Sequence, residues 1–303
     1  MDAVWSATRA RTYSECRRKY YYRYYLAPLG RGPEAPPRAL QAHQVKDLVG
    51  LEAWVGDLIH RLIESYLHRG RSGRWMREEE LLELARRQLS RGFRDSQAYW
   101  TAHPDEYRYR PALLDFHYYG DGSVTPERAA RIKESVEAGL RGFVRSGLAD
   151  QIRRVGREGW LPIDRNASAR LPDGTLVLVK PDFAFRDGEY LHVVDWKTGK
   201  ADTYWEMVQV TCYALFAQEK WDVSLAQVVP RVVHLSPEFH ESEVEFTPRT
   251  VREVLAIIHD SLADLRSVDP AQAGEDAFPL TPELGRCQWC QFRGMCDGAS
   301  RCA

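Results

Sequence analysis

Three short apolar segments between residues 156 and 196 constrain the fold of this chain more than any other feature. They cover residues 159–163, 175–179 and 190–195, and the turn sequences Pro172-Asp173-Gly174 and Asp187-Gly188 separate them. Segments of this length with turns between them predict an antiparallel meander. We expect further strands near residues 227–235 and 241–246.

Helical periodicity surrounds these strands on both sides. Apolar residues recur at three- and four-residue steps, and N-cap residues such as Ser6 and Thr247 precede some of these segments. We expect helices over residues 7–25, 47–69, 76–94, 126–149, 203–219 and 248–267, and a Gly- and Pro-rich loop over 30–44. The result is a mixed sheet flanked by helices, which belongs to the α/β or the α+β class.

The charge of the whole chain is nearly balanced, with 42 Lys and Arg residues against 43 Asp and Glu residues, which argues against a general nucleic-acid binder. The first 31 residues differ, because they hold seven basic residues, two acidic residues and six tyrosines. Basic side chains interleaved with aromatic rings suit phosphate contact and base stacking. The candidate nucleic-acid contacts are therefore Arg17, Arg18, Lys19 and Tyr20. The alternative is a helix whose tyrosine rings pack in a core.

No apolar run reaches the ~18 residues that a membrane helix needs. The first residues also lack the basic-then-apolar pattern of a secretory signal. We therefore expect no membrane partner and a cytoplasmic location. The absence of a P-loop motif predicts that the chain has no ATPase motor of its own.

The cysteines are clustered in a way that predicts a metal centre. Four of the six fall in the last 17 residues, and three of these, Cys287, Cys290 and Cys296, form a C-x2-C-x5-C motif. A four-ligand site needs one more thiolate, for which Cys16 and Cys302 are the candidates. Zinc and iron–sulfur clusters both accept four cysteines, so the spacing leaves both open. The alternative is a set of free buried thiols.

Two acidic residues near the ends of neighbouring predicted strands are candidate catalytic residues. Asp182 ends one strand and Asp195 ends the next, so a hairpin can place their carboxylates side by side. Paired carboxylates repel unless a cation lies between them, and hard oxygen ligands favour Mg²⁺ or Mn²⁺. Lys197 follows Asp195 by two residues and so shares its face of the strand. An isolated Asp-x-Lys sequence is usually a solvated surface pair, but its spacing from Pro181-Asp182 favours a catalytic site.

Two further residue pairs at helical i, i+4 spacing accompany these acids. Gln209 and Tyr213 share one face of the helix that follows and are positioned to hold Lys197, an attacking water or a nucleic-acid backbone. His60 and Glu64 share a face of the 47–69 helix. A lone histidine on such a helix is more often structural, but here a neutral imidazole would complete a metal site.

In this order, the motifs resemble a known family. They run Tyr13-Ser14-Glu15-Cys16-Arg17-Arg18-Lys19-Tyr20-Tyr21, Gly56-x3-His60-x3-Glu64, Pro181-Asp182, Asp195-x-Lys197-Thr198-Gly199, Gln209-x3-Tyr213 and Cys287-x2-Cys290-x5-Cys296. This succession is similar to the RecB-like branch of the PD-(D/E)XK nucleases. It is most similar to members with an iron–sulfur cluster, such as CRISPR-associated RecB-like exonucleases and AddB-type nuclease domains. The resemblance covers residues 5–69 and 156–302.

The resemblance implies a restriction-endonuclease-like α/β core that cuts DNA with Mg²⁺ or Mn²⁺. His60, Asp182 and Asp195 would bind the metal with help from the Trp196 carbonyl, Lys197 would be catalytic, and Gln209 and Tyr213 would support them. Cys16, Cys287, Cys290 and Cys296 would hold a 4Fe–4S cluster that joins the N-terminal helix to the C-terminus, which leaves Cys302 spare.

The chain departs from the family pattern at two places. It has Val179-Lys180-Pro181-Asp182 where the family usually has Gly-Arg-Ile-Asp, and residues 70–155 are longer than in compact members. We therefore expect N-terminal helices over 1–69, a helical insertion over 70–155, the nuclease core over 156–270 and a cysteine segment over 271–303.

The functional hypothesis is a metal-dependent DNA nuclease, an exonuclease on single-stranded ends, with a role in DNA repair or in CRISPR-type defence. A helicase or CRISPR adaptation proteins are the expected partners. One alternative is a non-catalytic iron–sulfur subunit that binds DNA in a helicase–nuclease or adaptation complex. Another is a structural protein stabilised by zinc.

Overall fold

The computed structural model describes residues 4–101, 111–120, 124–162, 167–171, 173–236, 238–242, 244, 246–268 and 274–300. Among these residues, no helix is both long and apolar enough to cross a membrane.

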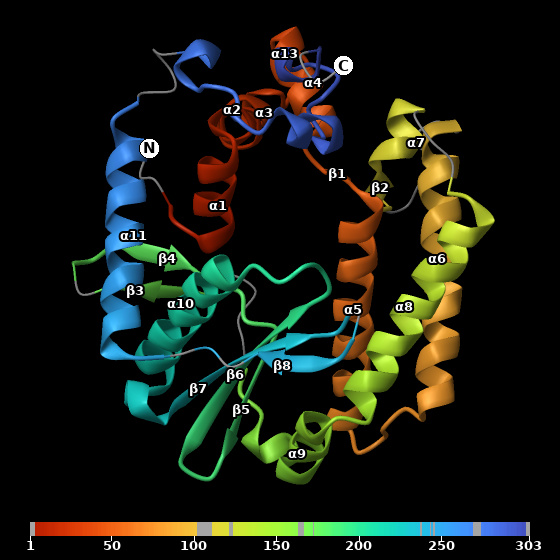
Figure 1. Cartoon of the computed structure of the whole chain (residues 1–303), viewed down its shortest axis with the longest axis vertical. Coiled ribbons are helices and arrows are strands. Elements are labelled where there is room, and N and C mark those ends of the chain that lie inside the picture. The colour runs from red at the N-terminus through yellow and green to blue at the C-terminus, as the bar shows by residue number, and fades with distance from the viewer. Residues whose placement is uncertain are drawn as a thin grey trace.

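A four-stranded mixed sheet forms the centre of the molecule, with the strand order β5-β6-β7-β8. Its strands are β5 (Phe183–Asp187), β6 (Tyr190–Lys197), β7 (Val228–His234) and β8 (His240–Ser242). β6 pairs antiparallel with β5 and parallel with β7, and β7 pairs antiparallel with β8. The tight turn through Gly188, which has a φ of 61°, joins β5 to β6. This arrangement confirms the predicted mixed sheet flanked by helices (Figure 1).

The prediction of a single antiparallel meander is wrong, because its three segments do not all join one sheet. Residues 175–179 contribute β4 (Leu176–Leu178), which pairs with β3 (Ser168–Arg170) in a separate two-stranded sheet. The 159–163 segment reaches the central sheet only through an isolated bridge from Trp160 to Phe185. The local apolar pattern therefore predicts the strands, but distant contacts decide which strands pair.

One face of the central sheet is covered by two helices from the second half of the chain. α10 (Thr203–Trp221) and α11 (Pro248–Arg266) form a core with β3, β4 and the residues of β6 and β7 that point toward them. Leu191 and Val193 of β6 point to this face. Asp195 and Lys197 continue the two-residue alternation, so they face α10 as well.

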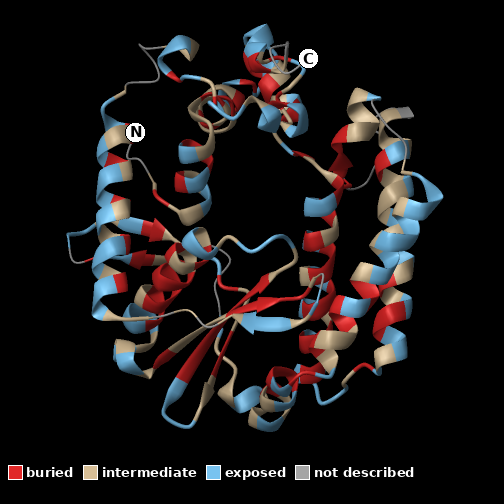
Figure 2. Ribbon diagram, in the orientation of Figure 1, coloured by how far each residue is buried: buried red, intermediate tan, exposed pale blue. Residues whose placement is uncertain are grey.

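The other face is covered by helices from the first half of the chain. These are α5 (Leu51–Arg71), α6 (Glu78–Thr101), α8 (Pro126–Val144) and α9 (Gly147–Val155). Their apolar side chains pack with Phe185, Val194 and Trp196 of the sheet in one continuous core. Figure 2 shows the buried positions concentrated on the sheet and on the helix sides that face it. The proposed helical insertion over 70–155 thus shares a core with the sheet.

The N-terminal helices and the C-terminal segment lie together at the far end of the molecule from the sheet (Figure 1). The elements there are α2 (Arg17–Tyr21), a π-helical turn (Tyr22–Leu26), α3 (Ala27–Leu29), α4 (Pro37–Val45) and α13 (Asp297–Ser300). α1 (Ala7–Glu15) leads to this end from the sheet region, where its Ala10 packs in the core around α10. Short parallel strands, β1 (Leu48–Val49) and β2 (Leu113–Leu114), tie this end to α7 (Asp115–Tyr119).

Two sequence predictions for this end need correction. Residues 30–44 are not all loop, because Pro37 occupies the first position of α4, where its missing N–H and fixed φ suit a helix start. The helix predicted over 7–25 breaks at Cys16, whose backbone is extended with φ −163° and ψ 107°. The Cys16 thiol then caps α2 by accepting a hydrogen bond from the Lys19 amide.

Candidate functional site

The two predicted acids lie side by side where β5 and β6 meet. Asp182 directly precedes β5, and its amide donates to the Val194 carbonyl of β6 at 3.1 Å. Its carboxylate Oδ2 accepts from the Trp196 amide at 2.8 Å, and its Oδ1 lies 3.2 Å from His60 Nδ1. Backbone pairing thus fixes Asp182 against the strand that carries Asp195.

Asp195 is almost completely buried, at 2% exposure, and faces α10. Its Oδ1 accepts from Gln209 Nε2 at 3.1 Å and lies 3.1 Å from the Tyr213 hydroxyl. That hydroxyl also lies 2.9 Å from the Lys180 carbonyl and can donate to either oxygen. Gln209 and Tyr213 therefore hold one side of the carboxylate in place.

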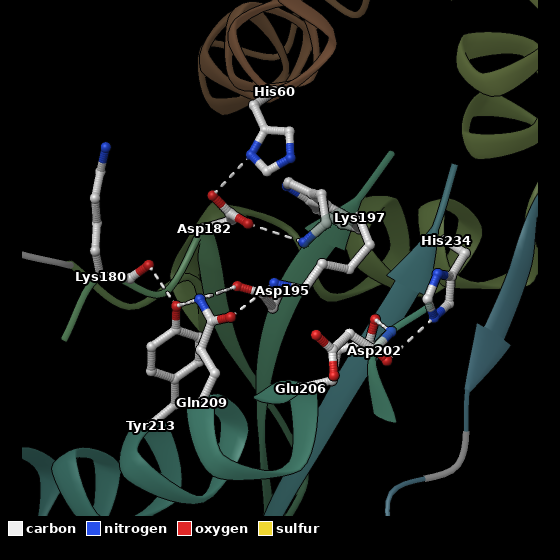
Figure 3. Close-up of polar contacts among 11 residues, drawn as sticks. His60, Lys180, Asp182, Asp195, Lys197, Asp202, Glu206, Gln209, Tyr213 and His234 are labelled. Atoms are coloured by element: carbon white, nitrogen blue, oxygen red, sulfur yellow. Dashed lines mark hydrogen bonds and ion pairs between the residues drawn. The ribbon is translucent and has the colours of Figure 1, made fainter. Parts of the chain in front are cut away.

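Lys197 lies against the other oxygen of Asp195. Its Nζ is 2.5 Å from Asp195 Oδ2 and donates to Gln209 Oε1 at 2.7 Å. Gln209 therefore bridges the two residues, since its amide nitrogen contacts Asp195 and its amide oxygen contacts Lys197. Figure 3 shows the ammonium held between α10 and the strand.

His60 reaches this site from α5, because that helix approaches the loop after β6 very closely. A Cβ atom added to Gly56, one turn before His60, would lie 2.4 Å from Thr198 Oγ1. Only a residue without a side chain allows this approach. We call His60, Asp182, Asp195, Lys197, Gln209 and Tyr213 the carboxylate cluster.

Burial and charge shift the protonation equilibria of the carboxylate cluster. Burial, and after it the negative charge of Asp182, raise the pKa of Asp195 to about 6 against the opposing effect of Lys197. Burial alone would lower the pKa of His60, but the hydrogen bond to Asp182 and the negative charges of Asp182 and Asp195 raise it. The cluster thus concentrates negative charge that only cations can compensate.

The donors present in the cluster fit a hard divalent cation. Two carboxylates and an imidazole converge, and the buried Oδ2 of Asp195 accepts no well-directed hydrogen bond from the residues that the structure describes. As the side chains stand, however, no group of three or more His, Cys, Asp or Glu residues among those described is placed to hold a metal ion. The Trp196 ring packs against Phe143 of α8, and the role of its carbonyl as a ligand stays a prediction.

Some contacts that shape this site carry no signal in the sequence. The approach of Gly56 to Thr198 and the contact of the Lys180 carbonyl with Tyr213 both join segments far apart in the chain. Gly56 belongs to the Gly56-x3-His60-x3-Glu64 motif, but the spacing of that motif does not explain why a glycine is needed at this position. A glycine on a helix face that is expected to pack against the end of a strand would be the sequence signal for such a contact.

The four cysteines singled out from the sequence line one cavity of about 240 Å³ between α2 and the C-terminal segment. Cys16 comes from the break before α2, and Cys287, Cys290 and Cys296 come from the motif near the C-terminus. All four are free thiols, and burial raises the pKa of Cys290 and of Cys296. Cys302 lies outside the described residues, and the buried Cys212 belongs to the core around α10.

A carboxylate from the C-terminal segment joins the two ends of the chain independently of the cysteines. Glu275 accepts from Arg18 Nη1 at 2.7 Å, from Arg38 at 2.8 Å and from the Tyr22 hydroxyl. Burial alone would raise its pKa, but these hydrogen bonds, above all that from Arg38, lower it to about 2. We call the four-cysteine cavity and the Glu275 contacts together the cysteine junction.

The proposed nucleic-acid contacts in the N-terminal segment are mostly structural. Arg18 is buried and donates to the Phe278 carbonyl at 2.7 Å, and Tyr20 is buried against other tyrosine rings. Arg17 pairs with Asp264 at 2.5 Å. The alternative of tyrosines packed in a core is therefore correct for Tyr20, and only Lys19 lines an open cavity. The physical reason is that the tyrosine rings of this segment pack against other side chains of the same chain.

A sheet edge with two carboxylates, a lysine and an imidazole defines the class of metal-dependent phosphodiesterases, in which acids and a lysine act on one phosphate. The model of the PD-(D/E)XK nuclease superfamily matches residues 4–297, and the chain belongs to this superfamily. A search of curated proteins returns no match. Membership implies a metal-dependent nuclease, which acts on nucleic acid.

Proposed function

We propose that this protein is a Mg²⁺- or Mn²⁺-dependent deoxyribonuclease of the RecB-like branch. The observation that carries the proposal is the convergence of Asp182, Asp195 and Lys197 at one strand end, with Lys197 Nζ 2.5 Å from Asp195 Oδ2. The superfamily match over nearly the whole chain supports it.

In this proposal, His60, Asp182, Asp195 and the Trp196 carbonyl hold the metal ion. A metal ion bound there would activate a coordinated water and stabilise the negative charge that develops on the scissile phosphate. The residues themselves supply the alignment, because Asp182 is fixed by the Trp196 amide and Asp195 by Gln209 and Tyr213.

Lys197 acts beside the metal ion. Gln209 holds its ammonium group at 2.7 Å, so the charge stays at the edge of the carboxylate pair. A fixed cation there can orient the attacking water and compensate charge on the phosphate oxygens. Tyr213 and Gln209 are supporting residues, since they contact Asp195 and Lys197.

We further propose that Cys16, Cys287, Cys290 and Cys296 bind a 4Fe–4S cluster. Their common cavity and their free thiols support four-cysteine ligation, and zinc is the alternative. The substrate would be a single-stranded DNA end cut by an exonuclease mechanism. The physiological setting would be repair or CRISPR-type defence with a helicase or adaptation proteins, in the cytoplasm.

The test is digestion of end-labelled single-stranded DNA with Mn²⁺, after purification without oxygen. We expect cleavage by the natural protein, loss of cleavage in Lys197→Ala, and full cleavage in the control Lys133→Ala, which changes an exposed lysine of α8. Cleavage that survives in Lys197→Ala would contradict the proposed role of this residue. No cleavage by the natural protein under any divalent metal would favour a non-catalytic DNA-binding subunit.

A further inference from the structure

A groove of about 630 Å³ opens directly from the carboxylate cluster along α5. His60 and Asp182 line one end of it. From there the groove follows α5 toward its last residue, Arg71, and the opposite wall is formed by residues 160–162 and 180–183. Because the groove is continuous with the two proposed metal ligands, whatever occupies it also reaches the reacting centre.

One face of α5 supplies the near wall. The α5 residues that line the groove are at positions 57, 60, 61, 64, 67, 68 and 71, which recur at helical spacing along one face. The stretch from Arg61 to Arg71 spans about 15 Å at 1.5 Å per residue. A stacked strand places one phosphate per 3.4 Å, so this wall can follow about four phosphates.

Three cations in the groove have no side-chain partner among the residues that the structure describes. Arg61, Arg71 and Lys180 are exposed, and none of them forms an ion pair or a side-chain hydrogen bond within the described residues. Arginines on the neighbouring helix α8 behave differently, since both Arg141 and Arg145 pair with Glu78. Cations that line a groove without an internal partner are free to bind an external anion.

The acids in the groove are confined to its metal-binding end. Asp57 and Glu64 lie one turn on either side of His60. Beyond Glu64, the α5 residues that line the groove include Arg71 and His68 and no acid. Figure 3 shows the Lys180 side chain extending away from Tyr213 on the side of the site from which His60 approaches.

The wall opposite α5 is partly apolar. It includes Trp160, whose ring packs edge-on against Phe183 at a centroid distance of 5.1 Å and contributes to the groove lining, together with Leu161. An apolar wall beside these cations suits an unpaired nucleic-acid strand, because its exposed ring faces can pack on that wall while its phosphates contact the cations. A duplex keeps its ring faces stacked inside.

We propose that this groove binds an unpaired nucleic-acid strand, with Arg61, Arg71 and Lys180 contacting its phosphates, and guides that strand to the carboxylate cluster. The inference rests on the proposed nuclease function, because that function places the reacting phosphate at Asp182. It assigns strand binding to α5 and to the segment before β5, and not to the tyrosine-rich N-terminal helices.

Binding without cleavage tests this groove independently of catalysis. Fluorescence anisotropy with a labelled single-stranded oligonucleotide in EDTA measures the dissociation constant for the natural protein and for Arg61→Ala/Arg71→Ala. We expect the constant to rise at least tenfold in this variant. The slope of log K against log salt should fall by about 1.4, since each phosphate contact on a single strand contributes roughly 0.7.

The matched control is Arg131→Ala/Arg252→Ala, which removes two exposed arginines outside the groove. It should bind like the natural protein. Equal weakening by both double variants, or tighter binding of a duplex than of a single strand, would overturn the proposal.

Cleavage assays with Mn²⁺ separate this proposal from the proposed function. If the natural protein cuts DNA and the groove variant binds and cuts normally, the groove assignment fails and the nuclease assignment stands. If the groove variant loses binding while the natural protein cuts nothing, the groove stands as a nucleic-acid site and the nuclease assignment fails.

Discussion

The carboxylate cluster and the cysteine junction both join distant parts of the chain, but by different means. In the carboxylate cluster, His60 and Asp182 are 122 residues apart, and direct hydrogen bonds among side chains and backbone fix their geometry. In the cysteine junction, Glu275 and a set of aromatic contacts join the ends, while the four thiols surround a cavity. Direct contacts between side chains and backbone hold the first region, and the second surrounds a cavity lined by thiols.

The two regions also differ in how they affect the stability of the fold. Asp195 is buried beside another carboxylate, so the carboxylate cluster lowers the stability of the fold to create a charged site. Glu275 is surrounded by donors and cations, so the junction adds stability. Substitutions in the two regions should therefore have opposite effects on folding.

The largest effect is expected for Asp195→Asn. This change removes a metal-binding charge, so we expect cleavage to fall by about a thousandfold or more. It also removes the repulsion with Asp182, so the melting temperature should stay the same or rise. Nuclease assays and thermal unfolding on the same preparation check both parts. A variant that loses activity because it unfolds would show a lower melting temperature, which would contradict this separation.

The next effect concerns the cysteine junction. In Cys287→Ser, one of the four proposed cluster ligands is lost, so iron and sulfide content and visible absorbance should fall to near zero in anaerobic preparations. The control Cys302→Ser should retain them. A colourless natural protein with one zinc per chain would instead assign the cavity to zinc.

Removal of the Glu275 carboxylate should lower stability by a smaller amount. In Glu275→Gln, the buried Arg18 keeps only the exposed Asp276, at 3.7 Å, as a charged partner, and we expect the free energy of unfolding to fall by about 2 kcal/mol at pH 7. Urea unfolding measures this change. Glu283→Gln is a suitable control, because Glu283 is exposed and pairs only with Arg286.

The same residue predicts a pH dependence. The pKa of Glu275 in the folded chain, about 2, lies below its ordinary value of 4.5. Its contribution is therefore fully present above pH 4.5 and is lost as the pH falls from 4.5 toward 2. Unfolding measured across this window should show a smaller loss in Glu275→Gln than in the natural protein. Parallel pH curves for the two proteins would show that Glu275 is not the responsible group.

A smaller and more local effect is expected at Gly56. In Gly56→Ala, the new methyl group meets Thr198 Oγ1 and pushes α5 from the loop after β6, so His60 moves and cleavage should fall about tenfold. Thr198→Ala removes that oxygen, so the double variant should recover most of the lost rate. A double variant as slow as Gly56→Ala would show that the close approach does not position His60.

The local sequence pattern predicted where helices and strands occur better than it predicted which strands pair. The helices after Ser6 and Thr247 begin where their caps predict, because an N-cap is a short-range signal. The separate β3–β4 hairpin was not predicted, because the turn sequence before β4 is equally compatible with pairing inside the central sheet. The helix start at Pro37 was missed because proline also marks loops.

For the site, the spacing predicted that Asp195 and Lys197 share a face, and both contact Gln209. The sequence also pointed to Cys16 as one of two candidates for the fourth thiol, and the structure places it in the cavity with the other three. The contacts of Glu275 with Arg18 and Arg38 were beyond reach, since no local pattern connects residues more than 230 positions apart.

Direct titration of Mn²⁺ into the metal-free protein tests the central claim that two carboxylates converge on a divalent ion. By calorimetry, the natural protein and the control Asp260→Asn, an exposed position on α11, should show the same binding site. Asp182→Asn/Asp195→Asn should lose that site while it remains folded. Unchanged Mn²⁺ binding by this double variant would contradict the account.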